Sequence, residues 1–179
     1  ENIRNYTNKP ILIHTLPTSS SFDVTHKIEN ISANTFQTEH TRESKDEIWQ
    51  NIYTSITKYP NKPAINLEPY YEGIHNDFFG KWQLEAFWFS VSSGAYSICY
   101  GAHGIWNVGD GNFLSQWGKQ TFKEALALKT PEILGKAYKV VLEQGILDWQ
   151  NVSINKIKNK VISISRMSKE GKKITYIPD

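Results

Sequence analysis

The stretch AINLEPYYEG, residues 64–73, decides how this chain is expected to fold. It opens with a short apolar strand that ends on Glu68, and Pro69 and two tyrosines then turn the chain out of the sheet. In barrels of alternating strands and helices, catalytic side chains lie at the carboxyl ends of the strands. Glu68 is therefore a candidate catalytic carboxylate.

A second segment of this kind, GAYSICYGAHGIWN, covers residues 94–107. A strand again runs into a glycine-rich turn, which carries His103 and Trp106. Carboxyl ends of neighbouring parallel strands meet at one edge of a sheet, so both segments are expected to contribute to one site.

Strands and helices alternate over most of the chain. We expect strands at 10–14, 31–37, 64–68 and 96–100, and helices at 23–29, 48–56, 82–91, 121–128 and 132–143. Ser44 and Glu47 are expected to form a capping box, and Pro131 suits the start of a helix. This order predicts an α/β fold of about four parallel βα units over residues 1–150.

After Trp149 the pattern changes to short alternating strands, expected at 152–154, 161–165 and 173–177. The tripeptide at 169–171 is the expected hairpin turn. Residues 151–179 thus read as the opening strands of an antiparallel β module. Three strands are few for an independent core.

Composition excludes several classes of protein. The 179 residues are 39% apolar with a net charge of +2, and neither a basic stripe nor a bilayer-length apolar run is present. Nucleic-acid binding and membrane insertion are therefore not expected. The single cysteine, Cys99, excludes an internal disulfide and a cysteine-built zinc site, and we expect it in the core.

Aromatic residues make up 13% of the chain, and several stand at strand ends. Sugar rings stack on such side chains while their hydroxyls bind polar neighbours. Trp106, Tyr71 and Tyr100 are the stacking candidates, Tyr100 being the one most suited to the core. Most other aromatics are expected to be core residues.

The remaining site candidates are polar residues at strand exits. Substrate-binding positions are predicted at His14, Gln37, His40, Tyr71, Glu72, His103 and Trp106. Glu72 equally suits a turn cap, and His103 a structural backbone hydrogen bond. Three of the histidines lack a recognised metal-ligand spacing with Glu68, so no metal is expected. Asp110, between two glycines, suits a turn.

The motifs at 66–73, 93–95 and 100–106, and more loosely at 36–40, resemble the apiosidase-like family of glycoside hydrolases. Members are TIM barrels, often followed by a β-sandwich described as collagen-binding. The resemblance covers roughly residues 10–150 and aligns the four units with barrel strands five to eight. It implies that the chain is the C-terminal half of a (β/α)₈ barrel, completed by an upstream half in a longer parent protein.

The resemblance further implies hydrolysis of O-glycosidic bonds in a polysaccharide or oligosaccharide, such as that of plant cell walls, without a cofactor. Glu68 matches the family's nucleophile position, and its partner carboxylate would come from barrel strand four. A separation of about 5 Å between the two would predict retention, and one of about 6.5 to 9.5 Å inversion. Export to the periplasm or the extracellular space is the expected location.

Two other functions stay open at this point. A degenerate barrel would keep the aromatic groove and bind carbohydrate without turnover. A complete small α/β domain with an interaction role would instead unfold as a cooperative monomer, whereas half a barrel exposes open sheet edges.

Overall fold

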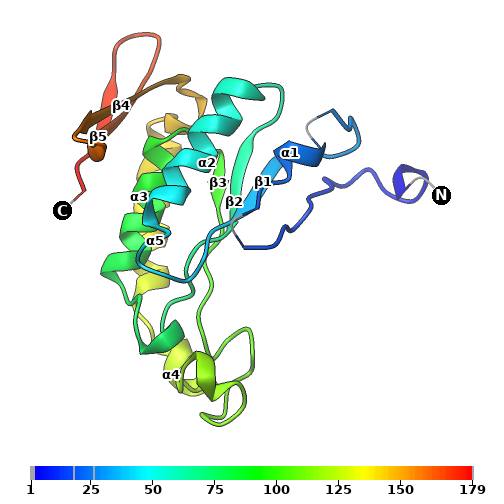
Figure 1. Cartoon of the computed structure of the whole chain (residues 1–179), viewed down its shortest axis with the longest axis vertical. Helices are drawn as coiled ribbons and strands as arrows, with labels where there is room; N and C mark the ends of the chain where they lie inside the picture. Colours follow the sequence, from blue (N-terminus) through cyan, green and yellow to red (C-terminus); the bar gives the residue numbers. More distant parts are fainter. Residues whose placement is uncertain (1–2, 18, 26, 179) are drawn as a thin grey trace.

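The computed structural model describes residues 3–17, 19–25 and 27–178, which form an α/β unit followed by a small antiparallel sheet (Figure 1). The elements in chain order are η1 (Ile3–Asn5), α1 (Phe22–Thr25), β1 (Asn34–Gln37), α2 (Lys45–Lys58), β2 (Ala64–Glu68), η2 (Ile74–Asn76), α3 (Lys81–Ser92), β3 (Ser97–Ile98), η3 (Ser115–Trp117), α4 (Phe122–Leu126), α5 (Thr130–Glu143), η4 (Ile146–Asp148), β4 (Asn151–Ile157), β5 (Lys160–Met167) and β6 (Lys173–Tyr176).

A parallel sheet with the order β1-β2-β3 forms the centre of the α/β unit. Helices α2, α3 and α5 lie along one side of it (Figure 1). The carboxyl ends of the strands point toward the bottom of Figure 1, where the loops after β2 and β3 lie with α4. The predicted α/β fold with parallel strands is confirmed for these three strands.

The main core lies between this sheet and its helices. Phe36 of β1, Ile52 of α2 and Phe89 of α3 are almost fully buried there. Burial alternates along β2, whose first and third residues are buried, whereas Ile65 and Leu67 are half-buried. Because successive side chains of a strand face opposite ways, one face of the sheet is covered and the other is open.

The predicted strand at 10–14 is wrong. These residues run beside β1 but form no strand. Ser32 N donates to Ile11 O, while Ile11 N donates to the Ser32 hydroxyl, 2.9 Å in each case. The Thr35 hydroxyl donates to Ile13 O. Side-chain hydroxyls thus make bonds that a backbone ladder would need, so pairing does not propagate.

The other strands and helices of the α/β unit are present, several with shifted ends. The strand expected at 31–37 begins only at Asn34, and the one expected at 96–100 shrinks to Ser97–Ile98, which pairs with β2 alone. The helix expected at 23–29 is the single turn α1. Helices α2, α3 and α5 match their predictions closely, with Pro131 in the first turn of α5.

The predicted capping box at Ser44 is wrong. Ser44 has helical backbone angles, and its hydroxyl points back to donate to Glu39 O and Thr41 O and accepts no bond from the first turn of α2. The capping box that does form lies at the start of α4. Thr121 accepts from Glu124 N, and the Glu124 carboxylate accepts from Thr121 N.

The strands β4, β5 and β6 form an antiparallel sheet, as predicted, with Gly171 at positive φ in the last turn. The β4–β5 hairpin lies at the top of Figure 1, opposite the loops at the carboxyl ends of β2 and β3. Val161 and Ile164 of β5 belong to the same core cluster as the side chains of α2 and α3. The division at residue 150 stays a prediction, but these two parts share a core.

Arg166 of β5 fastens the antiparallel sheet to the α/β unit. Its side chain is buried, and the guanidinium donates to the carbonyls of Val91, Ala95, Leu147 and Trp149 over 2.7 to 3.0 Å. Burial lowers the pKa of Arg166 to about 10, so it stays charged at neutral pH. These bonds close the carboxyl end of α3 against β5.

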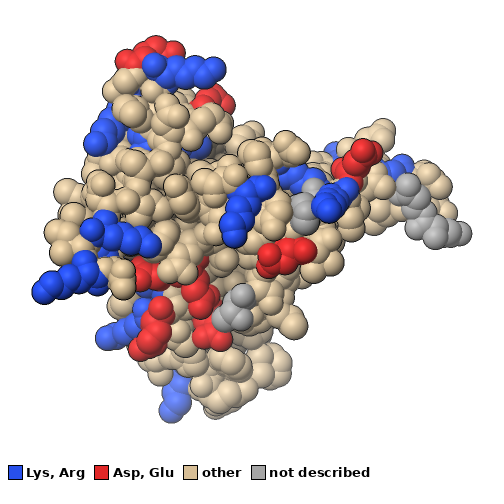
Figure 2. Space-filling view, turned by 45° about the horizontal axis from the view of Figure 1, so that its top comes forward, with Lys and Arg blue, Asp and Glu red and all other residues tan. Residues whose placement is uncertain are grey.

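Charges of both signs are mixed on the face shown in Figure 2, with no continuous basic stripe. None of the helices among the described residues is long and apolar enough to cross a membrane.

Candidate active site

Glu68 lies at the carboxyl end of β2, surrounded by side chains from three other segments. Gln37, at the end of β1, donates from Nε2 to Glu68 Oε1 at 2.7 Å. His40 Nε2 lies 3.1 Å from the same oxygen, and His14 Nε2 lies 2.9 Å from Oε2. The structure therefore brings together four of the residues that the sequence placed at one site.

The strand register explains why these side chains meet. Gln37 pairs with Glu68 across a register shift at the end of β1, so both side chains emerge at the same edge. The main chain of Glu68 is held on both sides, because its N–H donates to Asn66 Oδ1 and its carbonyl accepts from Thr38 N. Asn66 was not predicted, although an asparagine inside a buried strand was a signal for such a bond.

The Glu68 carboxylate is ionised at neutral pH. Its side chain is only 12% exposed, and this burial acts to raise its pKa. Hydrogen bonds from His40 and from the Tyr71 hydroxyl, together with the nearby His40 and His14 rings, outweigh burial and lower the pKa of Glu68 below its usual range. A carboxylate in this state suits a nucleophile or charge stabiliser rather than a proton donor.

His40 connects Glu68 to a row of stacked rings. Tyr71 N donates to His40 Nδ1 at 3.4 Å, while the other ring nitrogen, Nε2, faces Glu68. The His40 and Tyr71 ring centroids lie 4.8 Å apart, and those of Tyr71 and Trp106 lie 5.8 Å apart, with both pairs inclined by 26°. Trp106 is 45% exposed, so the row ends in an accessible indole.

Gly101 provides the space in which the Tyr71 ring lies. A Cβ atom at this position would come within 2.2 Å of the Tyr71 ring. The ring thus rests directly on the main chain that leaves β3, and any larger residue at 101 would displace it.

Glu72 lies behind the site rather than in it. Its carboxylate is buried and accepts from Tyr100 Oη at 2.6 Å, Thr130 Oγ1 at 2.7 Å and Gly80 N at 3.0 Å. Gly80 and Thr130 stand at the starts of α3 and α5. The sequence predicted that Glu72 binds substrate. In the structure its buried carboxylate instead connects the first residues of α3 and α5 with Tyr100, which follows β3.

His103 is also behind the site. The ring is fully buried, and Nε2 donates to Gly118 O at 2.7 Å, while its edge meets Trp106 at a centroid distance of 5.9 Å. Because the His103 ring is fully buried, it does not reach a ligand directly. The predicted position of His103 at the substrate therefore differs from its place in the structure. His14 and His40 both contact Glu68, whereas His103 does not. Within the described ranges, no group of three potential ligands is placed to hold a metal ion.

The predictions for Tyr100, Asp110 and Cys99 have different outcomes. Tyr100 is half-buried and donates to Glu72 instead of stacking on the surface. Asp110 is a turn residue, since its Oδ1 accepts from Asn112 N and Phe113 N at 2.8 Å each. Cys99 was expected in the core but is exposed, because β3 ends one residue before it.

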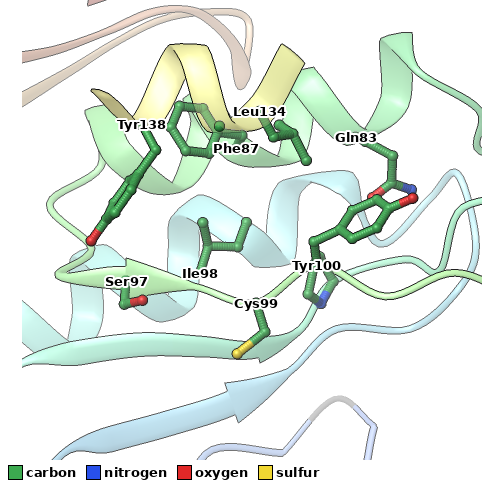
Figure 3. Close-up of a pocket in the computed structure, with 10 residues that line it drawn as sticks. Gln83, Phe87, Ser97, Ile98, Cys99, Tyr100, Leu134 and Tyr138 are labelled. Carbon is green, nitrogen blue, oxygen red and sulfur yellow. The ribbon is translucent and has the colours of Figure 1, made fainter. Parts of the chain in front are cut away.

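A cavity of about 270 Å³ lies between β3, α3 and α5, and Pro69 lines it but Glu68 does not. Figure 3 shows Ile98 of β3 facing Phe87 of α3 and Leu134 of α5, with Tyr138 further along α5. The cavity is mainly apolar and adjoins the sheet edge at which β3 has no further neighbour. It is distinct from the carboxylate site.

The fold is similar to that of two solved glycoside hydrolase structures. One solved structure described as a glycoside hydrolase superimposes with a TM-score of 0.75 at 18% identity, covering 90% of this chain and 42% of that one. A glycoside hydrolase family 5 structure from Bacteroides vulgatus gives 0.79 at 18% identity, with coverages of 93% and 42%. The chain therefore spans 42% of the length of these structures.

Residues 1–148 match the model of the family described as Apiosidase-like, catalytic domain. The chain belongs to the Apiosidase-like family, as its sequence motifs indicated, and is related to glycoside hydrolases. No curated protein sequence matches it significantly.

Proposed function

We propose that this chain carries the nucleophile side of a glycoside hydrolase active site, with Glu68 as the attacking carboxylate. The observation that carries the proposal is the environment of Glu68, an ionised carboxylate at a strand end, with donors from Gln37, His40 and Tyr71. Such a group attacks the anomeric carbon, or stabilises the oxocarbenium-like transition state, while an opposing acid protonates the leaving oxygen.

The opposing acid is proposed to lie in an upstream half of the barrel. Glu72, the other glutamate of residues 64–73, does not suit this acid, because its carboxylate is buried and already accepts hydrogen bonds from Tyr100, Thr130 and Gly80. The sheet ends at β1 and β3, and the apolar cavity beside β3 offers a surface against which further β/α units pack. Completion of a (β/α)₈ barrel by a preceding segment of the parent protein accounts for both features.

The substrate is proposed to be an oligosaccharide or polysaccharide, as in plant cell walls. Trp106 supplies an exposed indole beside Tyr71, and sugar C–H faces stack on such rings. The proposal includes export of the protein, because polysaccharides such as those of plant cell walls lie outside the cell. Fractionation of cells that express the native gene checks it.

The test uses the parent protein with its upstream half and a panel of aryl glycosides that includes pentosides. Glu68→Ala should lose nearly all turnover, and azide, a small external nucleophile, should restore part of it by attacking the anomeric carbon and giving a glycosyl azide. Retention of anomeric configuration by the unchanged protein would assign Glu68 as the nucleophile, whereas inversion would assign it to a base or stabilising role. Unchanged turnover would remove Glu68 from the mechanism.

The alternative is a carbohydrate-binding protein without turnover. The open, aromatic edge of the site at Trp106 and Tyr71 is the observation that keeps it in view. Sugar binding by the parent protein without hydrolysis of any glycoside in the panel would favour this second function.

A further inference from the structure

Trp117 is an exposed tryptophan held in a fixed position. Its ring lies 5.5 Å from that of His75, inclined by 40°, and its residue is 42% exposed. The adjoining main chain is fastened to the loop after β2, because Lys119 N donates to Asn76 Oδ1 at 3.2 Å. It is also held within its own loop after β3, where Gly118 O accepts from His103.

Gly118 shows how closely these two loops approach. It adopts φ of 145°, and a Cβ atom there would lie 2.9 Å from Gly73 O and 3.1 Å from the His103 ring. Only glycine allows this contact. The turn that carries Trp117 is therefore anchored at several points, while much of the indole stays in solvent. An exposed indole on a fixed main chain offers a flat face for stacking on a ligand.

Trp117 is continuous with the carboxylate site through His103. This buried ring packs against Trp106 and binds the carbonyl of Gly118, the residue that follows Trp117. Trp106 in turn stacks on Tyr71, which bonds to Glu68. His103 thus connects the turn that carries Trp117 with Trp106, which belongs to the row of rings that reaches Glu68.

We propose that Trp117, with His75 beside it, forms a second sugar-binding platform, so that the substrate is a chain of sugars extending beyond the cleaved bond. This inference rests on the proposed function and adds a preference for polymers over short glycosides. The class of ligand follows from the rings, since indole and imidazole faces stack on the C–H faces of sugars. Trp106 serves the sugar nearest Glu68, and Trp117 serves one further along the chain.

The experiment compares Trp117→Ala with Tyr96→Ala in the parent protein. Tyr96 is a matched control, because it is 53% exposed but lies at the opposite, amino end of β3. Trp117→Ala should reduce kcat/KM on soluble arabinoxylan or pectin about ten-fold, and on an aryl glycoside less than about two-fold. Trp117→Phe, which keeps a ring at this position, should recover most of the polymer activity.

Binding is measured separately in the Glu68→Gln background by titration with the same polymers. Weaker polymer binding in Trp117→Ala than in Tyr96→Ala supports the platform. Equal effects of the two substitutions on polymer, or equal losses on polymer and aryl glycoside in Trp117→Ala, would overturn it. Failure of the proposed function looks different, because Glu68→Gln would then leave turnover intact or no sugar would bind at all.

Discussion

The two ends of the molecule each hold a shielded ionisable group, and they satisfy it in different ways. Glu68, at the carboxyl end of the parallel sheet, is bound by the side chains of Gln37, His40, His14 and Tyr71. Arg166, at the other end, is bound by four backbone carbonyls.

Carbonyls cannot change their protonation state or leave their strand and helix ends. A charge held by them is fixed, and its contribution is to the fold. The partners of Glu68 are side chains, and His14 is half-exposed, so a ligand entering the site can displace it from the carboxylate. The difference separates a group available for chemistry from one that holds the structure together.

The largest effect is expected from Glu68→Gln, which should lower kcat of the parent protein by about 10³-fold or more, since only positioning and binding remain. Stability should change little compared with the effect on rate, because the amide keeps the shape of the side chain. Glu43→Gln, an exposed change in the loop after β1, is the control. If Glu68→Gln unfolded the protein but left the turnover of its folded fraction intact, Glu68 would serve the fold in the way that Arg166 does.

Arg166→Met should show the reverse pattern. Four carbonyls lose the guanidinium as a donor, and the free energy of unfolding should fall by about 3 kcal/mol, measured by urea denaturation. The control is Lys169→Met, an exposed position in the turn after β5. Activity of the folded fraction should be retained, and a specific loss of kcat at full stability would break the contrast.

Tyr71→Phe tests the pH response of Glu68. The lost hydroxyl is one of the donors that lower the pKa of Glu68, so that pKa should rise and the acid limb of kcat/KM should move upward by about one pH unit. The stack on His40 and Trp106 is kept by the ring. Tyr53→Phe on α2 serves as the control, and an acid limb that does not move would remove Tyr71 from the control of Glu68.

The same shift has a consequence for stability, and its sign follows from linkage. Because folding lowers the pKa of Glu68, the ionised carboxylate stabilises the fold above its unfolded-state pKa, and this contribution is lost as pH falls through the folded value. The stability of Glu68→Gln should accordingly be less sensitive to pH in this acidic range. Parallel acid-unfolding curves of the two proteins check it.

The smallest effect is expected at the cap of α4. Thr121→Ala removes the hydroxyl that accepts from Glu124 N and should cost about 1 kcal/mol of local stability. Faster hydrogen exchange confined to α4 is the expected readout. Ser44→Ala, at the mispredicted cap, should leave exchange in the first turn of α2 unchanged.

The sequence predicted the α/β alternation and the cluster around Glu68, because both depend on local signals. Apolar runs ending in proline or glycine fix where strands end, and parallel strands bring their ends together. Gln37 and His40 were found in this way, from position alone. Their distances to Glu68 depend on the register shift at the end of β1, which the sequence pattern does not reveal.

The errors arise where side chains compete with the backbone or where burial decides a role. The hydroxyls of Ser32 and Thr35 prevent the strand at 10–14, and the hydroxyl of Ser44 turns back to the preceding loop. Glu72 and His103 carry groups typical of an active site, yet tertiary packing places both behind it. No one-dimensional pattern distinguishes the two positions.

The bonds of Arg166 also set an order of assembly. They join β5 to carbonyls as far as 75 positions earlier in the chain, at the end of α3. During synthesis α3 therefore leaves the ribosome well before the residue that completes its last turn, and the docking of β5 is a late, long-range step. A protein truncated at residue 150, where the sequence pattern changes, would leave that step permanently unmade.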